Sequence, residues 1–277
     1  MSGPARTIAE KRAEFRALHA TGCFVLPNPW DVGSARYLQG LGFKALATTS
    51  SGFAWSRGHA DNTLPRDAIL AHLREIVAAT DLPVNADFES GFGADPAGVE
   101  ASVGLAVETG VAGLSVEDST GNDAAPLLPI EVAVERMRAA RRAIDARGGD
   151  TVLVGRAENF IAGVPNLDDA IARLQAYSEA GADCLYAPGI QTREQIVAVV
   201  TAVAPKPVNV LIGAKSDLTL DDLAALGVRR VSVGGALART AWGGFMHAAQ
   251  RLTEGRFDGF EGAAPGATLN AAFRSPT

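Results

Sequence analysis

Short apolar runs alternate with longer amphipathic segments along most of the chain. Four of these runs begin within three residues of a glycine that closes a helical stretch, namely Gly42, Gly110, Gly181 and Gly227. Glycine suits the left-handed backbone position just past a helix end, so each site predicts a helix that leads into a strand. Four such junctions favour alternating helices and strands, and hence a parallel sheet.

The apolar runs predict eight strands, at residues 23–28, 45–50, 83–89, 113–118, 152–158, 184–188, 207–212 and 230–235. Helices are expected between them, because residues that favour helix starts stand at the right places: Asp95 before Pro96, Asn166, Thr192 and Thr219. Thr7 and Glu10 have the spacing of a capping box, which predicts an additional N-terminal helix.

Eight parallel strands in an uninterrupted chain of 277 residues predict a (β/α)8 barrel of the TIM type. We expect one domain over residues 1–277, with a core at about 20–255 and a C-terminal tail at 256–277, because no Pro/Ser-rich linker divides the chain. A doubly wound open sheet is the alternative. It is disfavoured because no Gly-x-Gly-x-x-Gly motif follows the first predicted strand.

Composition narrows the class of protein. The 25 Lys and Arg against 31 Asp and Glu give a net charge of −6, and no basic run forms a patch, so we expect no nucleic-acid partner. No apolar stretch approaches the roughly 20 residues that span a bilayer, so we expect no membrane association. Two cysteines cannot form a disulfide framework, which favours a cytoplasmic location.

Acidic residues stand at the ends of four predicted strands, where a (β/α)8 barrel carries its chemistry. They are Asp31, Asp87, Glu89, Glu117, Asp118 and Glu158, with Arg156 and Arg239 as counter-charges. Crowded carboxylates repel one another unless a cation lies among them, and oxygen ligands favour Mg²⁺, with Mn²⁺ as an alternative. Asp87 and Glu89 are expected to share one strand face. Alternatively, these acids cap helices or pair with arginines, above all Asp118 and Glu158.

Other residue types are less informative about chemistry. No lysine stands at a strand end, which disfavours a Schiff-base mechanism. Cys23 and Cys184 begin predicted strands, which indicates a packing role. His59 lies in a loop on the catalytic side, as an acid or base or as an ordinary loop residue. Gly234 and Gly235 could instead form a phosphate cradle in a binding protein or a phosphate-handling barrel.

Several motifs, in order, resemble those of the isocitrate lyase/phosphoenolpyruvate mutase superfamily, from about residue 8 to residue 255. They are Thr49-Ser-Ser-Gly52 followed by Asp61, Asn85-Ala-Asp-Phe-Glu-Ser-Gly-Phe-Gly93, Val116-Glu-Asp118 and Gly155-Arg-Ala-Glu158. The resemblance implies a (β/α)8 barrel that uses Mg²⁺ and binds an α-keto or 2-hydroxy acid at the strand ends. It also implies cleavage or formation of C–C or P–C bonds through pyruvate-enolate-like species. Members of the superfamily form dimers or tetramers that exchange the last helix.

The resemblance also implies roles for individual residues. Asp87 resembles a metal ligand, and Glu89 and Glu117 resemble groups that hold the metal through water. Catalytic roles are implied for Arg156, which pairs with the substrate carboxylate and enolate oxygen, and for Asp61 and Glu117. The segment that binds the substrate carboxylate is expected at Ser50, Ser51 and Gly52. Further candidates for substrate binding are Trp30, Asp31, Asn209 and Arg239.

The loop after the fourth strand departs from the isocitrate lyases. Those enzymes carry Lys-[Lys/Arg]-Cys-Gly-His there, whereas residues 119–126 contain no Cys, Lys or His. A true isocitrate lyase is therefore not expected. The chain is most similar to short-loop members that bind α-keto acids, some of them oxaloacetate decarboxylases. We expect a Mg²⁺-dependent lyase that cleaves a C–C bond of a small α-keto or 2-hydroxy dicarboxylate. Phosphonopyruvate mutase or hydrolase chemistry, or a catalytically weak α-keto-acid-binding protein, are the alternatives.

Overall fold

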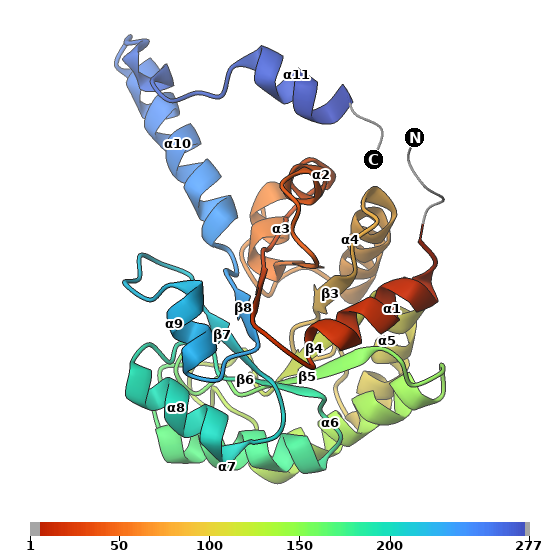
Figure 1. The fold of residues 1–277 in the computed structure, drawn as a ribbon. Coiled ribbons are helices and arrows are strands. Elements are labelled where there is room, and N and C mark those ends of the chain that lie inside the picture. Colours follow the sequence, from red (N-terminus) through yellow and green to blue (C-terminus); the bar gives the residue numbers. More distant parts are fainter. Residues whose placement is uncertain (1–5, 275–277) are drawn as a thin grey trace.

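The computed structural model of the protein describes residues 6–274 and confirms the (β/α)8 barrel (Figure 1). Eight parallel strands pair side by side in the order β1-β8-β7-β6-β5-β4-β3-β2. The strands are β1 (Phe24–Leu26), β2 (Leu46–Ala47), β3 (Val84–Asp87), β4 (Gly113–Glu117), β5 (Val152–Arg156), β6 (Cys184–Tyr186), β7 (Val208–Leu211) and β8 (Arg230–Ser232).

Helices precede the barrel and fill the gaps between its strands. They are α1 (Ile8–Leu18), α2 (Val32–Gly40), α3 (Ser50–Ser56), α4 (Arg66–Ala79), α5 (Pro96–Glu108), α6 (Ile130–Asp145), α7 (Leu167–Glu179), α8 (Arg193–Ala202) and α9 (Leu220–Ala225). The expected helix starts are confirmed: Thr7 and Glu10 form the capping box of α1. Side-chain caps on α5, α7, α8 and α9 come from Asp95, Asn166, Thr192 and Thr219.

The ring of strands closes between β1 and β2. There the Ala47 N–H donates to the Pro27 carbonyl at 3.0 Å. Because the strands are parallel, all of their carboxyl ends lie at one end of the barrel, and side chains far apart in sequence meet there. The fold therefore gathers the residues that follow each strand at a common mouth.

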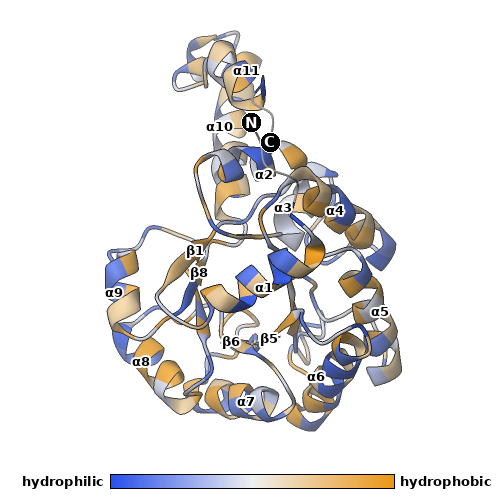
Figure 2. Ribbon diagram, turned by 45° about the vertical axis from the view of Figure 1, so that its right-hand side comes forward, coloured by the Kyte–Doolittle hydropathy of each residue, from blue (hydrophilic) through white to orange (hydrophobic). Residues whose placement is uncertain are grey.

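Helix α1 covers the opposite, amino-terminal end of the barrel and lies across the centre of the ring of helices (Figure 2). Its Arg12 and Lys11 donate to the carbonyls of Val111 and Thr80, which precede β4 and β3. Phe15 is fully buried in the apolar cluster under the strands. Burying an aromatic side chain is strongly favourable, so α1 belongs to the core although it precedes the barrel.

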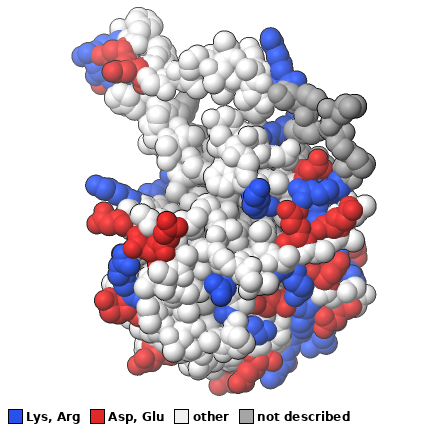
Figure 3. Space-filling view, in the orientation of Figure 1, with Lys and Arg blue, Asp and Glu red and all other residues white. Residues whose placement is uncertain are grey.

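The chain after β8 leaves the barrel. Helix α10 (Ala236–Thr253) runs outward, and after the short helix η1 (Asp258–Phe260) the chain returns in α11 (Gly266–Arg274), which contacts α2 (Figure 1). Most of the surface of this arm visible in Figure 3 is uncharged, and charge gathers at its tip. Its exposed apolar side chains are Leu237, Trp242, Phe245, Met246, Leu252, Phe257, Phe260, Leu269 and Phe273. Within residues 6–274, no helix combines the length and hydropathy that crossing a bilayer requires.

The strands are shorter than their apolar runs indicated. Strand β3 ends at Asp87, and Glu89 has a φ of 46°, in the left-handed region. The Gly91 N–H donates to the Phe88 carbonyl at 2.9 Å and closes a tight turn over these residues. The expectation that Asp87 and Glu89 share one strand face is therefore wrong, because side chains alternate only while the backbone stays extended.

Candidate active site

A cavity of about 140 Å³ lies inside the mouth of the barrel. It is lined by residues from all eight strands or the segments that directly follow them, so it is built by the closure of the ring. The lining residues are Asn28, Ala47, Thr48, Thr49, Ser50, Ser51, Asp61, Asn85, Asp87, Ser115, Arg156, Tyr186, Leu211, Arg230, Ser232, Gly234 and Gly235.

Arg156, the last residue of β5, is the centre of the charged part of this cavity. Its Nη1 lies 3.1 Å from Oδ1 of Asp87 and 3.0 Å from Oε2 of Glu117. Its Nε donates to Oε1 of Glu158, and the ring of Tyr186 lies 5.3 Å from the guanidinium carbon. These bonds use Nε and Nη1 and leave Nη2 for another partner. Three carboxyl groups around one guanidinium fix its position, and acidic groups outnumber the one base.

Asp87 is held in place by the start of α3. Its Oδ2 accepts hydrogen bonds from the backbone N–H and the hydroxyl of Ser50, each at 2.9 Å. The Asp87 N–H donates to the Thr48 hydroxyl at 2.9 Å. Asp61 joins the same group, because the Ser50 hydroxyl also lies 3.3 Å from its Oδ1. Thr48 and Ser50, at the end of β2 and the start of α3, therefore position Asp87, and Ser50 also contacts Asp61.

The acids of this cluster resist ionisation. Burial, and then the charges of Asp87 and Asp61, raise the pKa of Glu89 to about 8. Burial also raises the pKa of Glu117 well above its usual value, although Arg156 opposes the shift. The pKa of Asp61 is raised by burial and by Asp87, but its side chain is exposed to solvent, so the effect there is the weakest. A group of acids in this state is one that a cation would stabilise.

The residues present fit a divalent cation that retains water. Among residues 6–274, no three His, Cys, Asp or Glu side chains are arranged as a closed cation cage. Mg²⁺ does not need such a cage, because it is usually held by one or two carboxylates and keeps several waters. Asp87, Glu89 and Glu117 offer oxygen ligands only, and burial raises the pKa of Glu89 and of Glu117. This donor set fits Mg²⁺ or Mn²⁺.

Several of the proposed substrate ligands lie elsewhere. Asp31 caps α2, and its Oδ1 accepts from the Ser34 N–H at 2.7 Å. Trp30 lines a surface cavity beside Trp242 of α10. Arg239 lines another cavity on α10, where its Nη1 is 3.5 Å from the Gly213 carbonyl. None of these three predicted residues lines the cavity that contains Arg156.

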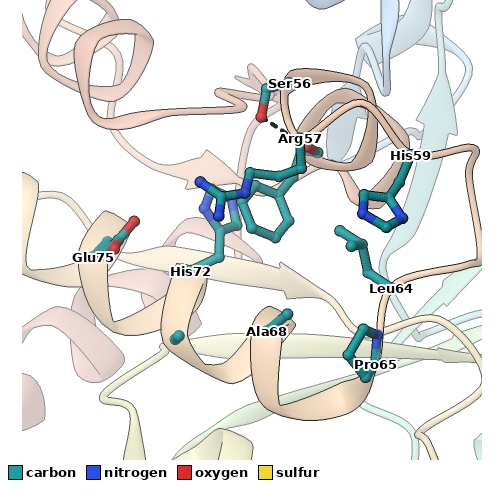
Figure 4. A pocket seen from close by; sticks show the side chains of 10 residues that line it. Ser56, Arg57, His59, Leu64, Pro65, Ala68, His72 and Glu75 are labelled. Atoms are coloured by element: carbon teal, nitrogen blue, oxygen red, sulfur yellow. Dashed lines mark hydrogen bonds between the residues drawn. The ribbon is translucent and has the colours of Figure 1, made fainter.

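His59 also lies outside that cavity. It lines a larger one, of about 550 Å³, between α3 and α4 (Figure 4). There the ring of Phe53 stacks on His72 at 3.8 Å, and Arg57 and Glu75 stand at the edge. This larger cavity holds no group of carboxylates, so size alone does not mark the site with the chemistry. The position of His59 therefore does not support a role as the acid or base of the reaction.

Two glycines permit close approaches beside the cavity. A Cβ on Gly52 would lie 2.7 Å from Cγ2 of Thr49 and 3.0 Å from Cβ of Trp30, and one on Gly235 would lie 2.9 Å from the Ser51 hydroxyl oxygen. The start of α3 therefore packs directly against the segment after β8. Gly52 is a spacer in this packing, whereas Ser50 and Ser51 line the cavity.

The alternative of a phosphate cradle after β8 loses support from the same region. The N–H groups of Val233 and Gly234 both donate to Oδ1 of Asn28 at 2.9 Å. A cradle would use such N–H groups for the phosphate oxygens. With these two donors already bonded, Gly234 and Gly235 shape the wall of the cavity.

The next residue after Glu117 faces the opposite way. Asp118 is buried on the outer side of the sheet, where its Oδ2 accepts from Nη1 of Arg173 at 3.0 Å and from the hydroxyl of Tyr177 at 2.5 Å. Its Oδ1 accepts from the Glu158 N–H at 2.8 Å. For Asp118, the expectation of an arginine partner is confirmed. Its role is to brace β4 against β5 and α7.

Comparison with known proteins shows the family to which the chain belongs. The family model named phosphoenolpyruvate phosphomutase matches residues 15–253. The protein belongs to this family. An oxaloacetate decarboxylase from Bradyrhizobium diazoefficiens is 32% identical over 224 residues, which cover 78% of this chain and 75% of that protein.

Solved structures of the phosphoenolpyruvate phosphomutase fold extend the comparison. A protein from Burkholderia cenocepacia J2315, named a "putative lyase/mutase", is 49% identical with a TM-score of 0.93, and the match covers 97% of this chain and 98% of that one. Oxaloacetate acetylhydrolase bound to its product oxalate is 26% identical with a TM-score of 0.83, covering 95% and 94%. The resemblance to the isocitrate lyase/phosphoenolpyruvate mutase superfamily is confirmed, and proteins similar to this chain include an oxaloacetate decarboxylase and an oxaloacetate acetylhydrolase.

In this member of the phosphoenolpyruvate phosphomutase family, the sequence analysis did not predict the residues that form the floor of the cavity. Arg230, Asn85, Ser232 and Tyr186 line it and belong to strands. Asn209, expected as an outer substrate contact, lies fully buried beneath them and donates to the Ser232 hydroxyl at 2.9 Å. Polar residues inside short apolar strands were the available signal, because a buried strand needs a reason to carry them.

Proposed function

We propose that the protein is a Mg²⁺-dependent lyase that cleaves a C–C bond of a small α-keto or 2-hydroxy dicarboxylate. The observation that carries this proposal is the group of Asp87, Glu117 and Glu158 around Arg156, at the strand ends of a barrel whose relatives include oxaloacetate decarboxylases. Glu89 and Asp61 are further acids of the same cluster, each with a raised pKa. One cation site beside one arginine is the pair of charges that an enolate intermediate requires.

Asp87 would hold the cation, with Glu89 and Glu117 contributing through its waters. When bound, the cation would supply Lewis-acid polarisation of the substrate oxygen. Arg156 keeps Nη2 free of the bonds that fix its Nε and Nη1, so this nitrogen can donate to the substrate carboxylate and to the oxygen that becomes the enolate. Ser51, at the start of α3, offers a hydroxyl and a backbone N–H on the other side of the cavity.

In an α-keto dicarboxylate such as oxaloacetate, the C–C bond to the departing carboxylate would break with release of CO₂, and its electron pair would form the enolate, whose oxygen Arg156 stabilises. The carbanionic carbon must then take a proton. The loop at residues 119–126 supplies no Cys, Lys or His for this step, and His59 lines a different cavity. We therefore assign the proton to a water molecule that enters from the mouth of the barrel.

A turnover screen tests this function. The purified protein is assayed with Mg²⁺ against oxaloacetate, 2-methylisocitrate, 2,3-dimethylmalate and phosphonopyruvate, and the products are identified. We expect product from a C–C substrate, its loss with EDTA, and a fall of about 10³-fold or more in Asp87→Ala. Asp221→Ala, an exposed residue on α9, is the matched control and should keep full activity. Full turnover and metal binding in Asp87→Ala would refute the mechanism.

P–C bond chemistry is the second candidate, because the matching family model is that of a phosphomutase. It uses the same cation and arginine but transfers or releases a phosphorus group. Phosphorus NMR of the phosphonopyruvate reaction distinguishes the two: a new phosphate ester or free phosphate, with no turnover of the C–C substrates, would move the protein to this branch. Tight binding of α-keto acids with no turnover at all would indicate a binding protein.

We also propose that the protein is a cytoplasmic homo-oligomer, a dimer or tetramer, in which the arm of α10 and α11 exchanges between subunits. Phe245 and Met246 on α10 are more than half exposed, and such an apolar surface is stabilised when a second copy covers it. Sedimentation velocity should show a dimer or tetramer for the wild type and smaller species for Phe245→Asp. A monomeric wild type at micromolar concentration would contradict the exchange.

A further inference from the structure

Arg230, the first residue of β8, is buried inside the barrel with 2% of its surface exposed. Its Nε donates to Oδ1 of Asn209 at 2.9 Å, and its Nη1 lies 3.3 Å from Oδ1 of Asn85. The same Nη1 lies 3.5 Å from Nε2 of His19, the residue that ends α1 as its C-cap. These contacts orient the guanidinium but involve Nε and Nη1 only, so the second terminal nitrogen has no protein acceptor among them.

Every one of these partners is neutral. Nδ1 of His19 lies 2.7 Å from the Phe15 carbonyl, which can only accept, so the proton is on Nδ1 and Nε2 is an acceptor. Burial, and the positive charge of Arg230, lower the pKa of His19 to about 3 and keep the ring uncharged. In residues 6–274, no carboxylate lies within 4.0 Å of Arg230. Arginine remains protonated in proteins, so the barrel interior contains an unpaired positive charge.

A buried charge is costly unless an opposite charge accompanies it. Three carboxyl groups surround Arg156, whereas none among residues 6–274 forms an ion pair with Arg230. Arg230 lines the same cavity as Arg156 and Asp87, together with Ser232 and Tyr186. A ligand in this cavity therefore meets the acidic cluster and Arg156 on one side and an uncompensated cation on the other.

We propose that Arg230 binds the second anionic group of the substrate and so makes the site selective for small acids that carry two anionic groups. The inference rests on the proposed function and adds the residue that binds the distal end of the substrate. The first carboxylate and the reacting oxygen lie at Arg156 and the cation, and the distal carboxylate or phosphonate lies at Arg230. The guanidinium would use its remaining nitrogen, with Ser232 beside it as a further donor.

The test is a binding measurement by calorimetry in the presence of Mg²⁺ with a pair of ligands that differ at the distal end. Difluorooxaloacetate carries the second carboxylate, and 3,3-difluoro-2-oxobutanoate carries a methyl group in its place. In the wild type, the diacid should bind at least about 10-fold more tightly than the monoacid. Equal affinity for the two would overturn the proposal without requiring any variant.

Arg230→Gln should weaken binding of the diacid by about 10- to 100-fold and change binding of the monoacid by less than about 2-fold, because a charge-assisted hydrogen bond is lost at the distal end only. Arg229→Gln is the matched control, since Arg229 is the preceding residue and donates to the Gly22 carbonyl at the outer rim. It should leave both affinities unchanged. A parallel loss of both ligands in Arg230→Gln would show a structural role and overturn the proposal.

Arg230→Lys provides a second variant that keeps the charge if the glutamine variant does not fold. It should retain a preference for the diacid, and loss of that preference in a folded protein would count against the proposal. Phosphonopyruvate as a third ligand separates a distal phosphonate from a distal carboxylate. If the wild type binds none of the three acids, the proposed function itself fails, whereas binding without dependence on Arg230 overturns only the role of this residue.

Discussion

Two arginines, Arg156 and Arg230, line the same cavity, and they differ in the charge of the groups around them. Arg156, near the mouth, contacts three carboxylates. Arg230, at the floor, has the side chains of Asn209, Asn85 and His19 as its hydrogen-bond partners. The mouth therefore has an excess of acidic groups, and the floor has a positive charge with no carboxylate beside it among residues 6–274. A bound cation would complement the acidic groups at the mouth, and an anionic group of a ligand would complement Arg230 at the floor.

Replacing Arg156 by lysine should produce the largest change, because this residue serves the reacting end. Lysine keeps the charge but loses the planar fork that binds two oxygens at once. We expect kcat/KM to fall by about 10²-fold or more in steady-state kinetics with the substrate identified by the screen. Arg193→Lys, in a surface ion pair with Asp222, is the control. An unchanged kcat/KM would mean that Arg156 is only a counter-charge for the acids.

Glu89 should make the cation-free protein sensitive to pH. Its pKa rises from 4.5 to about 8 on folding, so between these values the folded state holds a proton that the unfolded chain has lost. Stability therefore falls as the pH rises through this range. In EDTA, the Tm should fall by several degrees from about pH 5 to about pH 9, and by less in Glu89→Gln.

Glu75→Gln, an exposed residue on α4, provides the control for this pH profile and should leave its slope unchanged. Addition of Mg²⁺ should flatten the slope in the wild type, because the cation then compensates the charge at the mouth. Identical slopes in Glu89→Gln and the wild type would show that another group controls the pH dependence.

The smallest effect is expected at Asp31, outside the cavity. Asp31→Ala removes the cap of α2 and should lower stability by about 1 kcal/mol, with kcat/KM unchanged within about 2-fold. Thermal unfolding and steady-state kinetics measure the two quantities. Asp95→Ala removes the cap of α5 and should cost a similar amount. A loss of turnover in Asp31→Ala alone would return this residue to the substrate-binding set that the sequence indicated.

The outline of the barrel could be predicted because helix ends and strands have local causes. The capping box of Thr7 and Glu10 and the cap at Asn166 depend on residues three apart, and the structure has both. The residues at the mouth could also be predicted, since Asp87, Glu117 and Arg156 end their strands and parallel strands end together. Their use as cation and substrate ligands stays a prediction.

The floor of the cavity could not be predicted in the same way. Arg230 stands at the start of its strand, where the rule for barrels expects residues that serve stability. Its long side chain crosses the interior, and what it meets depends on Asn85, Asn209 and His19, from three distant segments. The shared strand face of Asp87 and Glu89 was wrong for a different reason: a tight turn replaces the expected strand. Both depend on tertiary structure that no local pattern contains.

Helix α1, which closes the amino-terminal end of the barrel, has a consequence for hydration. It contributes no residue to the lining of the cavity, but Phe15 and His19 stand between Arg230 and the solvent below. Without this helix, bulk water would enter from beneath, and the higher local dielectric would weaken the attraction between Arg230 and an anion. A segment that precedes the first strand therefore sets how strongly the barrel can hold a charged molecule at its other end.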